Sequence, residues 1–303
     1  MRQNLTAPAA ICFAMMLFAI SDNYIDLIAR QMSVWQYHAM RSALILPVMV
    51  VTIAIVGQFW SIWPVRPFFV LSRALFAITA LVLYFAAIPA VGVSLAAAGL
   101  FTSPIFVVLI SVLVFGETVG WRRILGLGLG FLGVCLVLEI GTQPLRAMAL
   151  APMVGGAFYA LNVVWTRRYC QQETAGCLAF WNMTMFLIVG TLGVLSIPLL
   201  SGWFGHLEGV DFAIHPPAWP DWPTVWVILA MGAAGATGMA CLAVGYRGAP
   251  STYAALFDFS FLLWVPLFAW LINGETLTTR TAIGMALIVM AGTLALMAIP
   301  RRD

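Results

Sequence analysis

Two stretches of this chain carry one pattern at a constant offset: SLAAAGLFTSPIFVVLISVLVFGETVGWRRILGLGLGFLG (residues 94–133) and TYAALFDFSFLLWVPLFAWLINGETLTTRTAIGMALIVMA (residues 252–291). The double alanine, the phenylalanine that follows it, the Gly-Glu-Thr triplet and one later arginine and glycine coincide between them. The repeat predicts that the chain has two homologous halves, residues 1–146 and residues 147–303.

The composition places both halves in a lipid bilayer. Hydrophobic residues make up 63% of the chain and charged residues 8%, with a mean hydropathy of +1.02. A helix needs about 20 apolar residues to cross a bilayer. Ten such stretches predict spans near Ala7–Leu27, Val34–Val56, Phe68–Ile88, Val91–Phe115, Trp121–Ile140, Ala147–Thr166, Cys177–Leu200, Val225–Tyr246, Pro250–Ile272 and Arg280–Ile299.

The expected fold is therefore an all-α integral membrane protein with ten transmembrane helices arranged as two five-helix repeats. Because five is odd, the second repeat enters the membrane from the opposite side, and such inverted repeats are typical of transporters. Simple duplication of a structural bundle is the alternative. The first span is expected to be retained and not cleaved as a signal peptide, because Asp22 and Asp26 lie at its far end and no small-residue cleavage site follows.

The arginines predict the orientation, because positively charged loops stay in the cytoplasm. With the N-terminus inside, ten arginines fall on the cytoplasmic side and three outside: Arg2, Arg66, Arg73, Arg122, Arg123, Arg167, Arg168, Arg247, Arg301 and Arg302 against Arg30, Arg146 and Arg280. Both termini are therefore expected in the cytoplasm. The outer connection from Ser201 to Trp222 carries tryptophans suited to a membrane interface.

We expect this membrane to be the plasma (inner) membrane of a bacterium.

The polar residues favour a carrier over an enzyme. The three histidines and five cysteines show no metal-ligand spacing, and the chain has neither a glycine-rich phosphate loop nor a nucleophile elbow. We expect no enzymatic activity, no cofactor, no metal and no nucleic-acid partner; the expected partners are the bilayer and a small-molecule substrate. Gly126 and Gly130 form a small-residue face that serves either internal packing or a dimer contact, so monomer and homodimer both stay open.

The stretch Tyr84–Gly133 resembles the EamA-type half of the drug/metabolite transporter superfamily. The resemblance lies in a small-residue-rich helix with Pro104, in the Gly116-Glu117 pair, and in a glycine-rich fifth helix. The second half repeats the pair as Gly274-Glu275, but it has Leu262 where the first half has Pro104. The resemblance implies a ten-helix carrier in which the first to fourth and sixth to ninth helices surround a central cavity.

Three ionisable side chains fall deep in predicted spans, where charges are costly and often functional: Asp22, Arg41 and Asp258. Asp22 and Arg41 are equidistant from a turn near Gln31 and Met32, which predicts a mutually neutralising pair; alternatively, Arg41 receives a substrate carboxylate. Asp258 either binds a cationic group of the cargo, carries a coupled proton, or serves as a buried structural acid. Glu117 and Glu275 are expected to pair with Arg122 and Arg280 or to cap the helix that follows each.

The remaining substrate-binding residues are predicted from their polar or aromatic character and their position in the spans. They are Asn23, Tyr84, Tyr159, Asn162, Trp165, Tyr246 and Trp264. Together these features predict a secondary transporter for a small organic metabolite, an amino acid or a related zwitterion or cation, and the family resemblance favours export. The alternatives are uptake of a cofactor-like or nucleoside-type metabolite by the same fold, and a membrane scaffold subunit that moves no solute.

Overall fold

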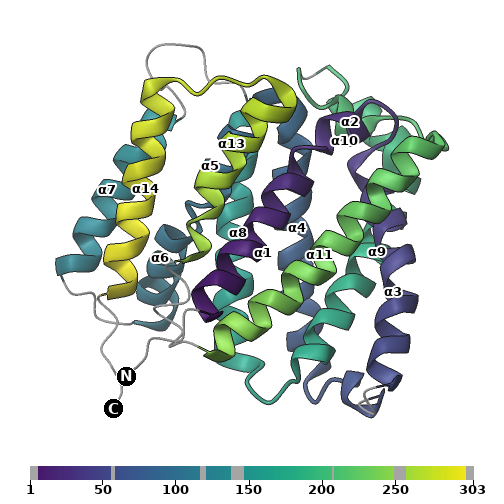
Figure 1. The fold of residues 1–303 in the computed structure, drawn as a ribbon, viewed down its shortest axis with the longest axis horizontal. Helices are drawn as coiled ribbons and strands as arrows, with labels where there is room; N and C mark the ends of the chain where they lie inside the picture. The colour runs from purple at the N-terminus through teal and green to yellow at the C-terminus, as the bar shows by residue number, and fades with distance from the viewer. Residues whose placement is uncertain are drawn as a thin grey trace.

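The computed structural model describes residues 6–55, 59–116, 121–137, 147–206, 208–248 and 257–297, and the regular structure in these residues is helical. In the first half the helices are α1 (Thr6–Asp22), α2 (Ile25–Ala29), α3 (Val34–Ile55), the 3-10 helix η1 (Phe59–Ile62), α4 (Pro67–Val91), α5 (Val93–Leu100), α6 (Ser103–Phe115) and α7 (Trp121–Val137). In the second half they are α8 (Ala147–Tyr169), α9 (Ala175–Phe204), α10 (Asp211–Ile214), α11 (Trp222–Gly248), α13 (Phe261–Asn273) and α14 (Thr279–Met297). Figure 1 shows the long helices side by side in one bundle.

Seven helical stretches in the described part of the chain are long and apolar enough to cross a membrane. They are Ala7–Ala29, Val34–Ile55, Pro67–Val91, Val93–Val114, Met148–Tyr169, Ala175–Phe204 and Trp222–Leu242, and two shorter apolar helices follow them. The all-helical, multi-span prediction is confirmed. The count of ten spans and the inverted topology stay predictions.

Two predicted spans of the first half are not continuous helices. The first is interrupted after Asp22, before α2, and the fourth is interrupted at Phe101 and Thr102, between α5 and α6. Proline disfavours helical geometry in the residue before it and has no N–H for the backbone ladder, so Pro104 favours the second interruption. The Thr102 hydroxyl also donates to the Gly99 carbonyl at 2.7 Å, which occupies a carbonyl of the turn that is ending.

The second half has a bend at the position equivalent to Phe101 and Thr102. Phe257 and Asp258 are helical, Phe259 and Ser260 form a turn, and α13 begins at Phe261. The two bends are in contact: the Phe101 ring lies 5.8 Å from Phe259 and stacks on Phe261 at 5.3 Å between centroids. Since the second half has no proline at the position of Pro104, the bend does not depend on that residue alone.

Each long helix of the first half packs on a helix of the second half. The pairs are α7 with α14, α4 with α8, α1 with α11 and α3 with α9. Glycines allow the close approaches: a Cβ on Gly133 would lie 2.8 Å from the Gly284 carbonyl oxygen, and one on Gly130 would collide with Ile105. The Gly130 part of the small-residue face on α7 therefore serves packing within the chain.

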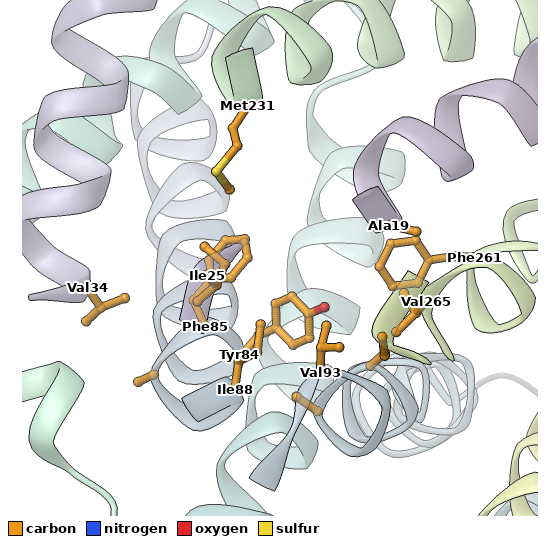
Figure 2. Packing of buried hydrophobic residues seen from close by; sticks show 14 of the residues in the cluster. Ala19, Ile25, Val34, Tyr84, Phe85, Ile88, Val93, Met231, Phe261 and Val265 are labelled. Atoms are coloured by element: carbon orange, nitrogen blue, oxygen red, sulfur yellow. The ribbon is translucent and has the colours of Figure 1, made fainter. Parts of the chain in front are cut away.

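The buried apolar core lies where the halves meet. Figure 2 shows Tyr84, Phe85 and Ile88 of α4 near Ile25 of α2, with Phe261 and Val265 of α13 on the other side. Transfer of such side chains out of water contributes about 1.5–3 kcal/mol each in a soluble protein. In lipid, close van der Waals packing replaces that driving force, which is why the small residues at the helix contacts matter.

Candidate functional site

Asp22 is the last residue of α1 and is bound by α4. The Tyr84 hydroxyl donates to Asp22 Oδ2 at 2.8 Å, and both side chains are buried. The sequence placed Tyr84 among the residues that contact substrate. In this conformation its ring is 1% exposed, and its hydroxyl holds the carboxylate of Asp22.

Arg41 does not form the predicted direct ion pair with Asp22, although the structure describes both residues. Its Nη1 donates to the Tyr37 hydroxyl at 3.3 Å, and its guanidinium lies over the rings of Tyr37 and Phe186 at 5.4 and 5.8 Å. The prediction assumed a simple helical hairpin, whereas α2 and its flanking bends turn Asp22 toward α4. The two charges act on each other only at longer range.

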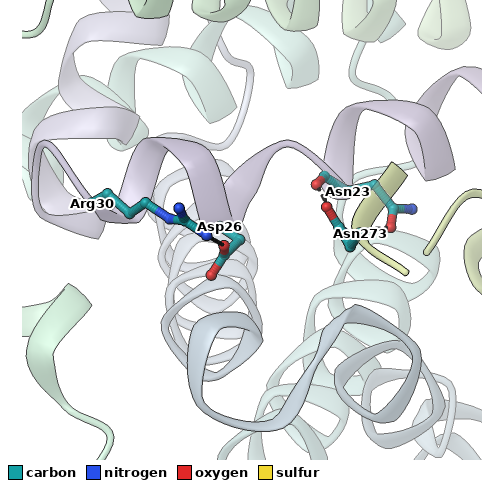
Figure 3. A network of polar contacts seen from close by, with 4 residues as sticks. All are labelled: Asn23, Asp26, Arg30 and Asn273. Atoms are coloured by element: carbon teal, nitrogen blue, oxygen red, sulfur yellow. Dashed lines mark hydrogen bonds and ion pairs between the residues drawn. The ribbon is translucent and has the colours of Figure 1, made fainter. Parts of the chain in front are cut away.

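Asn23 connects α1 to α13. Its amide group donates to the carbonyls of Ala19 at 2.8 Å and Val265 at 3.3 Å, while Asn273 donates to both oxygens of Asn23 at 3.2 Å. Figure 3 shows the Asn23–Asn273 contact beside the exposed Asp26–Arg30 pair. Asn23 was predicted to bind substrate, but its amide is engaged in contacts between the two halves in this conformation.

Arg73 is a polar anchor that the sequence analysis missed. It was counted with the arginines of the cytoplasmic side, although the predicted span Phe68–Ile88 contains it, and the structure places it inside α4, which begins at Pro67. Its Nε donates to Asn162 Oδ1 of α8 at 3.0 Å and its Nη1 to the Leu178 carbonyl of α9 at 3.3 Å. Its position inside the predicted span Phe68–Ile88 could have marked it as a candidate, because charges within spans are often functional.

Two further predicted residues lie in the same region as Arg73. Trp165 donates through Nε1 to the Ser72 hydroxyl at 3.0 Å and packs edge-on against Phe76. The Tyr159 hydroxyl is buried and lies within electrostatic range of Arg73 and Asp258, while 41% of the surface of the whole residue is exposed. The structure thus brings Tyr159, Asn162, Trp165 and Asp258 into one neighbourhood.

The last two predicted site residues lie on α11 and α13. Trp264 is half-buried, stacks on Phe268, and has an Nε1 without a hydrogen-bond partner among the described residues. Tyr246 is a residue of α11, but its side chain lies outside the described part of the structure.

Glu275 caps a helix of the other half. Its Oε1 accepts the backbone N–H of Val93 and its Oε2 accepts the Ser94 hydroxyl, both at 3.1 Å, at the start of α5. A carboxylate there is stabilised by the free N–H groups and the positive end of the helix dipole. Gly92, with φ +81°, lies against Glu275, and a Cβ there would collide with the carboxylate. The prediction that Glu275 pairs with Arg280 or caps the helix that follows it is therefore wrong. Glu117 lies outside the described residues.

Comparison with known proteins agrees with this architecture. The model of the EamA-like transporter family matches residues 5–139 and 146–297. The chain is 27% identical over 208 residues to an uncharacterized transporter of Helicobacter pylori (strain ATCC 700392 / 26695), covering 67% of this chain and 65% of the relative. It is 26% identical over 196 residues to a riboflavin transporter of Vibrio cholerae, covering 63% of this chain and 58% of that protein.

The chain spans less than two thirds of the length of these curated relatives. A solved crystal structure shares the fold with a TM-score of 0.60 at 17% identity, covering 94% of each chain. The two family matches, one in each half of the sequence, show that the chain belongs to the EamA-like transporter family.

Proposed function

We propose that this transporter is a ten-helix secondary carrier built from two inverted repeats, residues 1–146 and residues 147–303, that moves a small organic metabolite by alternating access. The observation that carries the proposal is the pair of helix bends at Phe101–Thr102 and Phe259–Ser260, which occupy equivalent positions in the repeats and touch each other. Discontinuous helices at corresponding positions of two repeats are typical of transporter binding sites.

Charged side chains of both signs within the helices support an amino acid or a related zwitterion as the cargo. Asp258 lies in the turn of helix just before the second bend, within electrostatic range of the Tyr159 hydroxyl. A carboxylate beside an aromatic face suits an ammonium group, through charge and through cation–π attraction. Arg41 and Arg73 supply positive charge on α3 and α4. The family resemblance favours export from the cytoplasm of a bacterial cell.

A second cargo is favoured by the riboflavin transporter of Vibrio cholerae, which matches 63% of this chain. A flat, cofactor-like solute would be bound mainly by the aromatic side chains near the bends and less by the charged side chains. The two cargoes therefore differ in how strongly transport depends on Asp258.

Flux into proteoliposomes tests the proposal. Purified protein is reconstituted and offered each of the labelled amino acids, a set of amines and riboflavin, with protein-free liposomes as the control. A carrier moves at least one of them faster than the control, and unlabelled solute inside accelerates the exchange. Equal flux for all solutes with and without protein would favour the scaffold alternative.

Reporter fusions test the topology. Both termini and the connection at Arg167 and Arg168 should report the cytoplasm, and a fusion between Ser201 and Trp222 should report the outside. A cytoplasmic signal from that long connection would contradict the inverted arrangement.

A further inference from the structure

Three polar side chains on one face of α3 have unused hydrogen-bonding atoms. His38, Arg41 and Ser42 are spaced so that they share a helix face. His38 and Ser42 are fully buried, and neither ring nitrogen of His38, nor Ser42 Oγ, nor Arg41 Nε has a hydrogen-bond partner among the described residues. Buried polar atoms are nearly always bonded, so three such residues in two helical turns need an explanation.

Helix α9 forms the wall opposite this face. A Cβ on Gly193 would collide with the Trp35 ring, and one on Gly190 would lie 2.7 Å from the backbone of Ala39. The Phe186 ring then packs on His38, 5.3 Å between centroids, and lies under the Arg41 guanidinium. This order shows that α9 runs antiparallel to α3 with their backbones close together.

The same register places Asn182 one turn beyond Phe186, on the same face of α9. Its Oδ1 is also buried without a hydrogen-bond partner among the described residues. The contact between α3 and α9 thus has several unused donors on α3 and one unused amide acceptor on α9.

The chemistry of these groups fits an anion. Arg41 offers a charged N–H, the His38 imidazole offers an N–H, and Ser42 offers a hydroxyl. The rings of Tyr37 and Phe186 hold the guanidinium in place, while Asp22 is bound by Tyr84 and makes no direct bond to Arg41. Such donors bind carboxylate and phosphate oxygens through charge-assisted hydrogen bonds.

We propose that His38, Arg41 and Ser42 form a subsite for an oxyanion group of the transported solute, a carboxylate or a phosphate, with Asn182 accepting an N–H or O–H of the same solute. The proposal rests on the carrier function proposed above. It narrows the substrate class to solutes that carry an oxyanion.

Ligand-induced thermal stabilisation of the full-length purified protein tests the subsite. The probes are the standard amino acids, phenylethylamine and 3-phenylpropionate, which separate the ammonium from the carboxylate of phenylalanine, and riboflavin with riboflavin 5′-phosphate, which differ by a phosphate. The variants are Arg41→Gln, Arg41→Lys and Ser42→Ala, with Arg30→Gln as the matched control because Arg30 is in an exposed pair with Asp26.

The expected result is that at least one carboxylate or phosphate binds the wild type, while its counterpart without the oxyanion binds at least tenfold more weakly. Arg41→Gln should weaken that binding by about ten- to a hundredfold, the loss of one charge-assisted contact. Arg41→Lys should keep part of the affinity, Ser42→Ala should lose less than Arg41→Gln, and Arg30→Gln should bind as the wild type does. If Arg41→Gln fails to fold, the comparison of the probe pairs on the wild type and the affinity of Ser42→Ala still test the subsite.

Two outcomes overturn the inference and leave the carrier function standing. In the first, only neutral or cationic probes bind, and these probes are also transported. In the second, the wild type and Arg41→Gln bind the oxyanion probe with equal affinity. Oxyanion binding that needs Arg41, without flux of any probe into proteoliposomes, would instead keep the subsite and contradict the proposed function. A wild type that neither binds nor transports any probe contradicts both.

Discussion

Two polar regions of the bundle use their charges in different ways. At the end of the bundle where α2 lies, the Asp22–Arg41 cluster consists of Asp22, Tyr37, His38, Arg41, Ser42 and Tyr84, and it keeps several buried donors unused. Near the opposite end, the Arg73–Asn162 cluster consists of Ser72, Arg73, Tyr159, Asn162 and Trp165, and its donors reach acceptors on neighbouring helices. The comparison indicates that the second cluster connects the halves, while the first has capacity for a ligand.

Removal of Arg73 should have the largest effect on stability. Arg73→Met leaves Asn162 Oδ1 and the Leu178 carbonyl without this donor, and hydrogen bonds from charged groups contribute about 1.5–3 kcal/mol each when buried. Because Arg73 is only half-buried, the lower part of that range applies. The Tm in detergent should fall by several degrees. Arg30→Met, in the exposed pair, is the control and should leave the Tm unchanged. Equal Tm values for the two variants would contradict the connecting role of Arg73.

Asp258→Asn should affect transport and spare the fold. The substitution keeps the shape of the side chain and removes the charge near Tyr159. One charge-assisted contact accounts for a loss of about ten- to a hundredfold in flux. The measurement is proteoliposome flux at equal amounts of folded protein, with and without an imposed pH gradient. A coupled proton predicts that the wild type responds to the gradient and the variant does not. Wild-type flux for every solute would make Asp258 a structural acid.

Double-mutant cycles separate the two possible partners of Asp22. Asp22→Asn with Tyr84→Phe should show a coupling energy of about 1.5–3 kcal/mol, because the Tyr84 hydroxyl contacts the carboxylate directly. Asp22→Asn with Arg41→Gln should show less than about 1 kcal/mol, since no hydrogen bond joins those residues. The readout is thermal unfolding in detergent. A larger coupling with Arg41 than with Tyr84 would restore the ion pair that the sequence predicted.

The smallest effect is expected at Asp221, which caps the start of α11. Asp221 Oδ1 accepts the Thr224 backbone N–H at 2.9 Å, and the hydrogen bonds from Thr224 lower the pKa of this carboxyl below its ordinary value. A carboxyl with a lowered pKa stabilises the folded state at pH values above its ordinary pKa of about 3.9. This contribution is lost as the pH falls through the lowered pKa. Asp221→Ala should therefore lower the Tm slightly at pH 7 and not at all in strong acid. If the difference in Tm between the wild type and Asp221→Ala were the same at pH 7 and in strong acid, Asp221 would not be the cap of α11.

The helical, membrane-spanning fold could be predicted because each span is a long apolar stretch and because the Gly-Glu-Thr triplet recurs in both halves. The positions of Tyr159, Asn162 and Trp165 on α8 follow from their spacing, which places them on neighbouring turns. The partners of Asp22 and Glu275 could not be predicted, because span lengths fix the depth of a residue and not the direction in which a bend turns it. Arg73 was missed because it was counted only as a cytoplasmic charge, although the predicted span Phe68–Ile88 contains it.

The most direct test of the central claim compares the accessibility of the two clusters. In a variant whose five cysteines are replaced, Ser42→Cys and Ser72→Cys place one reporter in each cluster, and a membrane-impermeant thiol reagent is applied from each side of oriented vesicles. The account predicts that a transported solute lowers the labelling of one reporter and raises that of the other. Labelling of both reporters that is unchanged by the solute, or that rises and falls together, would contradict alternating access between the two clusters.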